Sequence, residues 1–202
     1  MKKIRLDRIS ADPPAGMTKD KASKRFEALG EELFGLQDQL FGAKLASVLV
    51  VRVHQLVPEK LWQERYQHIA DFEELRAEHG TLILKFFLHI TKEEQEKRLL
   101  EREEDPKAAW KLNPKDWQER AHWDAYTEAY EEAIARTHTA HAPWIVVPAN
   151  KKWYRNLVVA ESIVAALRPH RKGWAEKLEA TGKAGRAQLE AYRRQEKLNS
   201  AP

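Results

Sequence analysis

The chain has 202 residues, of which 43% are apolar and 33% charged, a composition typical of a globular protein with a sizeable core. It has no cysteine, which excludes disulfides, thiolate metal sites and a cysteine nucleophile, and no apolar run that could cross a bilayer. We therefore expect a cytoplasmic protein with no membrane partner. The net charge of the chain is +4. Residues 168–202 carry nine basic and four acidic residues, a net charge of +5, so the other 167 residues have a net charge of −1.

The first part of the chain predicts an arm, two helices and one strand. Residues 1–17 are irregular, and from 19 to 44 apolar residues recur every three or four positions, which predicts an amphipathic helix. The β-branched run 47–53 predicts a strand buried on both faces. A helix over 59–79 follows, and Gly80 ends it.

The middle of the chain predicts a second strand and a capped helix. Residues 81–90 form the strand, and Thr91 with Glu94 three positions later forms a capping box that starts a helix to about residue 103. The segment 105–114 is bounded by an aspartate and a proline and interrupts the helical pattern.

The last part predicts a helix over 116–137, a short strand over 144–147 and a helix over 152–167. Alternation of strands and helices indicates an α/β protein with a parallel sheet. We expect the strand at 47–53 to pair in parallel with 82–88, and that strand to pair with 145–147.

The eight glycines include no phosphate-binding loop. Gly30 and Gly35 have the spacing of G-x-x-x-x-G-K, but Leu36 stands where the lysine belongs, and no G-x-G-x-x-G occurs. The sequence therefore lacks the backbone cradle that commonly holds nucleotide phosphates.

Several short motifs nevertheless resemble one family in order and spacing. They are Thr91-Lys92-Glu93-Glu94-Gln95, Asp105-Pro106-Lys107, Trp123-Asp124-x-Tyr126, Ala142-Pro143-Trp144 and Val146-Val147-Pro148-Ala149. Between about residues 50 and 167 the chain resembles the family-2 polyphosphate kinases, and most closely the subgroup that phosphorylates nucleoside mono- and diphosphates.

The resemblance implies a P-loop-kinase fold and Mg²⁺-dependent transfer of phosphate between inorganic polyphosphate and adenine nucleotides. The family's phosphate loop and its Walker B aspartate have no counterpart here, so no catalytic residue and no metal ligand is assigned. We interpret 47–58 as two family strands spliced together, with the segment between them missing. The expected fold is a truncated, three-layer P-loop-kinase-like sandwich with a reduced parallel sheet of three strands, a helical lid and a basic helical tail.

The resemblance also implies a lid at about residues 103–121 that closes over phosphates. The basic residues that it assigns to phosphate binding are Arg52, Arg98, Arg102, Lys107, Lys111 and Arg120. Arg98 and Arg102 lie four residues apart on one helix face and could contact the same anion. The alternative is an ordinary charged helix turn, because acidic residues are interleaved.

Two further features have open interpretations. The loop Pro148, Ala149, Asn150 and Lys151 follows a strand and is either the nucleotide-base side of the site or a turn before a helix. Arg52, inside the spliced strand, either contacts an anion or faces solvent at a new sheet edge, which would favour association.

We therefore divide the chain into an irregular arm (1–17), one domain (18–168) and a basic tail (169–202) that is helical or disordered. The first hypothesis is a polyphosphate-dependent nucleotide kinase that is catalytically impaired. The alternative is a non-catalytic protein that binds polyphosphate or nucleotides or joins an oligomer. We expect a homo-oligomer, and RNA binding by the tail is the least favoured function.

Overall fold

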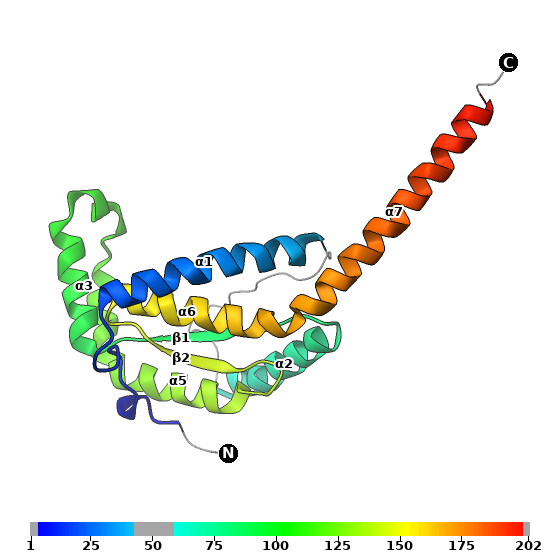
Figure 1. Ribbon diagram of the computed structural model, residues 1–202. Helices are drawn as coiled ribbons and strands as arrows, with labels where there is room; N and C mark the ends of the chain where they lie inside the picture. The colour runs from blue at the N-terminus through cyan, green and yellow to red at the C-terminus, as the bar shows by residue number, and fades with distance from the viewer. Residues whose placement is uncertain (1–3, 43–58, 200–202) are drawn as a thin grey trace.

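The protein is described by a computed structural model that covers residues 4–42 and 59–199 (Figure 1). The α-helices are α1 (Lys19–Gly42), α2 (Glu59–Glu78), α3 (Lys92–Glu104), α4 (Pro114–Glu119), α5 (Trp123–Thr137), α6 (Lys152–Leu167) and α7 (Arg171–Asn199). The strands are β1 (Lys85–His89) and β2 (Trp144–Pro148), and short 3-10 helices are η1 (Leu6–Arg8), η2 (Pro106–Lys111), η3 (Arg120–His122) and η4 (Arg168–His170).

The sheet of the described residues consists of β1 and β2, which pair in parallel. Lys85 lies opposite Trp144 and His89 opposite Pro148, so the predicted pairing of these two strands is confirmed. The strand predicted at 47–53, and with it Arg52 and the pairing to 82–88, lies outside the described residues.

Helices cover both faces of the two strands. Helices α1 and α6 pack together on one face, and α5 with α2 lies on the other, which confirms an α/β sandwich with three layers (Figure 1). The range 116–137 is helical as predicted, and it consists of α4, the 3-10 turn η3 and α5. The chain turns where the Arg120 side chain is bound to α3, as described below.

The core beside α1 is built from the predicted amphipathic pattern. Leu36 is 2% exposed and packs with Val164 and Trp174, and Leu29 and Leu33 lie against this cluster. Phe26, which belongs to the same sequence pattern, is 44% exposed.

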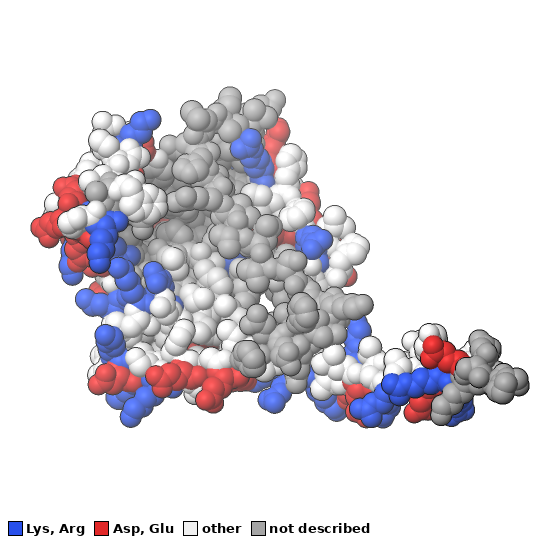
Figure 2. Space-filling model, turned by 90° about the horizontal axis from the view of Figure 1, so that it is seen from above, with Lys and Arg blue, Asp and Glu red and all other residues white. Residues whose placement is uncertain are grey.

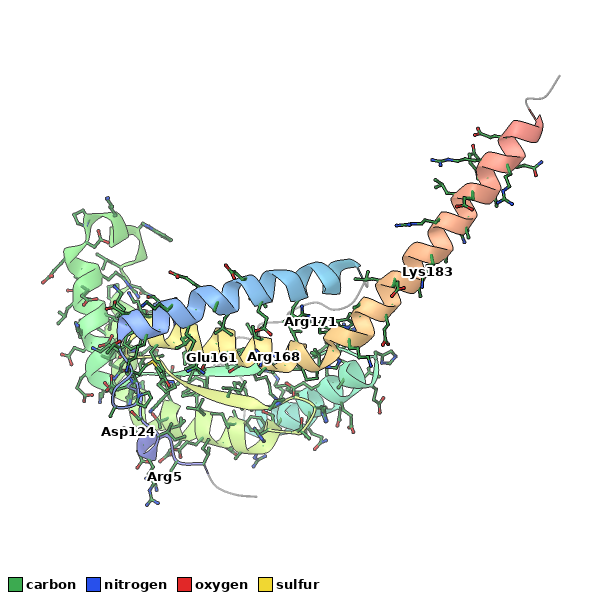
Figure 3. The ribbon with its side chains drawn as sticks, in the orientation of Figure 1. Arg5, Asp124, Glu161, Arg168, Arg171 and Lys183 are labelled. Carbon is green, nitrogen blue, oxygen red and sulfur yellow. The ribbon has the colours of Figure 1, made fainter. Side chains whose placement is uncertain are left out.

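Two ion pairs join α1 to α6 and to the short helix η4 that follows α6 (Figure 3). Arg25 Nε lies 2.6 Å from Glu161 Oε1 on α6, and Arg168 Nε lies 2.8 Å from Glu32 Oε1. The hydrogen bond from Arg168 lowers the pKa of the half-buried Glu32 carboxyl. Within the described ranges no helix has both the length and the apolar character needed to span a bilayer.

A buried ion pair joins β1 to α2. The Lys85 ammonium donates to Glu73 Oε2 at 2.5 Å and to the carbonyl of Thr137, also at 2.5 Å, and it lies 5.3 Å from the centre of the Trp144 ring. Burial lowers the pKa of Lys85, and the Glu73 carboxylate opposes that shift. Strand β1 is thus anchored at its first residue to both helices of one layer.

Candidate functional site

The carboxyl ends of β1 and β2 lie side by side. Open α/β sheets bind their ligands at the carboxyl ends of their strands. His89 ends β1, and its carbonyl accepts the backbone N–H of Ala149, just after β2, at 2.8 Å. The Asn150 side chain accepts the N–H of Thr91 at 3.1 Å. The predicted loop Pro148–Lys151 therefore lies at this edge, with Ala149 buried and Lys151 exposed.

Arg98 joins this loop to the helix that leads into the lid. Its guanidinium donates to the carbonyl of Ala149 at 2.6 Å and to that of Asn150 at 3.1 Å, and its Nε lies 2.9 Å from Glu94 Oε1. The Arg98 side chain is 23% exposed. Two predicted elements, the arginine and the loop, are thus brought together, but through the loop's backbone.

The other two lid arginines are also bound to protein groups. Arg102 Nη1 lies 3.1 Å from Asp116 Oδ2, which links α3 to α4. Arg120 donates to the Lys92 carbonyl at 2.9 Å and to Glu96 at 2.8 Å, and its side chain is only 12% exposed. These bonds close the lid segment back onto α3. Contact of Arg98 and Arg102 with one anion remains a prediction.

The lid lysines differ from the arginines. Lys107 on η2 and Lys115 on α4 are exposed and make no ion pair with any described residue. Lys111 ends η2, and its side chain lies outside what the structure describes. An unpaired surface ammonium keeps its charge available to an external anion, which distinguishes these two lysines from the arginines bound within the protein.

The N-terminal arm crosses the same strand ends, which the sequence did not predict. His89 Nε2 lies 2.9 Å from the Ile9 carbonyl, and the Asn150 backbone N–H donates to Ala11 O at 3.0 Å. The Asn150 side chain also donates to Asp12 Oδ2 at 3.1 Å. An irregular segment has no periodicity from which its contacts could be inferred, so no sequence signal marked this position.

Carboxylates do not gather into a metal site in this part of the protein. Across residues 4–42 and 59–199, no three His, Cys, Asp or Glu side chains are grouped so that they could hold an ion. Asp116 is paired with Arg102, and Asp105 accepts the backbone N–H of Lys107 at 2.9 Å, as a helix-end contact. The described residues therefore do not fit the Mg²⁺ that the sequence resemblance implies.

A cavity of about 440 Å³ lies at the opposite end of the strands. Leu82, Leu84 and Pro143 line it together with His141 and His170. His141 Nε2 is buried and has no hydrogen-bond partner among the described residues. Because this cavity is at the amino ends of β1 and β2, it is not the place where the sheet would present a nucleotide.

The sandwich with a helical lid beyond β1 defines a nucleotide-kinase-like fold, and comparisons with known proteins identify its family. The family described as Polyphosphate kinase 2 (PPK2) matches residues 19–173. The crystal structure of Polyphosphate Kinase 2 from Arthrobacter aurescens superposes with a TM-score of 0.71 at 27% identity, covering 82% of this chain and 86% of that one. The chain therefore belongs to the polyphosphate kinase 2 family.

Two curated relatives match about half of their own length. The AMP/ADP-polyphosphate phosphotransferase of Meiothermus ruber is 55% identical over 120 residues, which are 59% of this chain and 45% of the relative. The ADP-polyphosphate phosphotransferase of Rhodopseudomonas palustris is 36% identical over 141 residues, 64% of this chain and 49% of the relative. The chain thus spans about half the length of these relatives.

Proposed function

We propose that this chain binds inorganic polyphosphate through the lysines of its lid, beside an adenine-nucleotide site at the loop after β2, and by itself transfers little or no phosphate. The observation that carries the proposal is the combination of exposed lid lysines with a sequence that has no phosphate-binding loop. Its relatives are named polyphosphate phosphotransferases of AMP and ADP, which supports these two ligand classes.

Phosphoryl transfer depends on positioning and charge stabilisation, which a glycine loop, a lysine and metal-bound carboxylates ordinarily supply. Losing one such hydrogen-bond donor typically costs about 10²–10³ in rate. The lid lysines can neutralise phosphate charge and shield it from water, but they do not align an attacking oxygen. Binding without efficient turnover is the expected result.

The activity arm of the test is ATP formation from ADP and polyphosphate with Mg²⁺, followed by luciferase luminescence. We expect no ATP above a no-protein blank. A turnover rate within about tenfold of the typical enzyme rate of ~10 s⁻¹ would overturn the proposal that the chain is catalytically impaired.

The binding arm compares two double variants that remove the same charge. Lys107→Ala/Lys115→Ala removes the exposed lid lysines, and Lys172→Ala/Lys183→Ala removes two exposed lysines from α7. Each lysine–phosphate contact on a single-stranded polyanion contributes about 0.7 to the slope of log K against log salt, so the loss of two such contacts in the lid variant should lower that slope by about 1.4.

The α7 variant should leave affinity and slope unchanged. If only the α7 variant lost polyphosphate binding, the anion site would lie on the tail, which would contradict the proposal. An absence of polyphosphate binding at low salt would also overturn it.

A further inference from the structure

Helix α7 leaves the body of the protein and continues into solvent (Figure 1). Trp174, 7% exposed, anchors its first turns against Leu36 and Val164. From residue 179 to 196 every described side chain is exposed, and Lys183 lies where the helix has already left the body (Figure 3). The family match ends at residue 173, so this projecting part lies beyond it.

One face of the projecting helix lacks charge over four turns. Leu178, Gly182, Gly185, Leu189 and Tyr192 follow one another at alternating steps of four and three residues, which places them on one stripe. Trp174 lies four residues before Leu178, so the stripe continues the face that α7 buries in the core. Leu189 is 53% exposed and Tyr192 is 64% exposed.

Neither glycine on this stripe is required by a contact with another part of the described chain. Glycine in an exposed helix interior is less stable than alanine. No atom lies within 4 Å of a Cβ built at Gly182 or Gly185, so no close approach inside this chain requires them. Beside two large apolar residues, they form shallow depressions that a facing helix could fill.

We propose that a second copy of this chain packs its α7 against this stripe in an antiparallel pair. A two-fold axis near residue 187 places Leu189 over the partner's Gly185 and Tyr192 over the partner's Gly182, so large residues fill the depressions on both sides. A parallel pair would instead set each glycine opposite its own copy and leave the layers unfilled. The antiparallel arrangement also puts the two bodies at opposite ends.

The charges beside the stripe agree with this pairing. Glu179, which also pairs with Lys183 of its own helix, and Arg193 flank it on the same side, so an antiparallel partner brings each close to the opposite charge, twice per dimer. Arg186 lies beside its own copy near the axis, and its length and exposure let the two guanidinium groups separate.

A polyanion is the less suitable occupant of α7. Three of its basic residues are already paired along the helix with acidic ones, in Lys172–Glu176, Lys183–Glu179 and Arg194–Glu190. Figure 2 shows basic and acidic side chains interleaved on the projecting arm rather than separated into a basic stripe. An apolar stripe bordered by both signs of charge fits a second helix better.

The first test measures mass by sedimentation or light scattering on the whole chain. The chain of 23.5 kDa should form a concentration-dependent species of about twice that mass. Leu189→Glu/Tyr192→Glu should weaken the dimer at least about 100-fold, because two charges enter an apolar seam. Ala187→Glu/Ala191→Glu puts the same charge on the opposite face and should not.

At a chain concentration of about 100 μM, even a weak dimer with a Kd of about 100 μM would be half formed. A wild-type chain that stays monomeric at that concentration would overturn the proposal. So would a dimer that survives the stripe variant. If polyphosphate or RNA is needed before any dimer forms, α7 is a polyanion site and the proposal fails. Circular dichroism of both variants establishes that α7 remains helical.

The second test determines orientation and uses the absence of cysteine from the chain. Gln188→Cys and Gln195→Cys place single thiols on the same exposed edge of the helix, and packed helix axes are about 8–10 Å apart. In the antiparallel pair the thiols at 188 are adjacent, whereas those at 195 lie about 24 Å apart along the axis. A short bis-maleimide should therefore link Gln188→Cys only, and efficient linking of Gln195→Cys would exclude the antiparallel pair.

Discussion

Replacement of Arg98 tests whether the lid arginines hold the structure together. Arg98→Met removes three hydrogen bonds at once, to Glu94 and to the carbonyls of Ala149 and Asn150. The side chains of Arg98 and Glu94 are 23% and 17% exposed, so water reaches the vacated groups only in part. Breaking a buried pair costs about 3–5 kcal/mol, and the partial exposure places this case near 3 kcal/mol.

The assay is urea unfolding followed by circular dichroism, where 3 kcal/mol is a change of about 10² in the unfolding equilibrium constant. Lys97→Met is the matched control, because Lys97 pairs with Glu101 at the same spacing on α3 but the two side chains are 63% and 55% exposed. That exposed pair should contribute less than about 0.5 kcal/mol. Arg98→Lys should recover only part of the loss, because one ammonium cannot reproduce the fork geometry.

Equal stabilities of Arg98→Met and Lys97→Met, within about 0.5 kcal/mol, would refute this reasoning. Arg98 would then be available to an external anion, and the division of the lid into structural arginines and phosphate-contacting lysines would be wrong.

Three further predictions concern single contacts and use the same unfolding assay. Lys85→Met should destabilise the protein by about 3–5 kcal/mol, because it leaves the buried Glu73 carboxylate unpaired. Adding Glu73→Leu should recover most of that stability, and a double variant as unstable as Lys85→Met would contradict this explanation. Thr91→Ala should cost about 1 kcal/mol by removing the N-cap bond to the Glu94 N–H, and no loss would show that the cap contributes nothing. The pKa of Glu32 is lowered from 4.5 by Arg168, so its contribution is present above pH 4.5 and lost as the pH falls through the lower folded value. Glu32→Gln should therefore differ more from wild type at pH 7 than at about pH 3, and a difference that is independent of pH would contradict the assignment.

Local structure was predictable where a residue and its partner are close in the chain. Thr91 and Glu94 are three residues apart, and the structure has the Thr91 side chain accepting the Glu94 N–H at 3.2 Å. The strands around residues 85 and 145 are short, apolar runs with helices between them, which is enough to predict a parallel pair. The helical range predicted over 116–137 is confirmed, but its division by η3 was not foreseen, because Arg120 in η3 bonds to Lys92 and Glu96 on another helix.

The sequence by itself determined the family and the α/β class, because these depend on motifs and periodicities along one chain. Only the tertiary structure showed that Arg98, Arg102 and Arg120 are bound to protein groups, whereas Lys107 and Lys115 are exposed. Arg98 meets the carbonyls of residues that lie 51 and 52 positions later, and the arm meets Asn150 across 138 positions. Such contacts involve backbone carbonyls and an irregular segment, and neither has a residue pattern that predicts them. The tertiary structure is therefore needed to show which charges are bound within the protein and which face solvent.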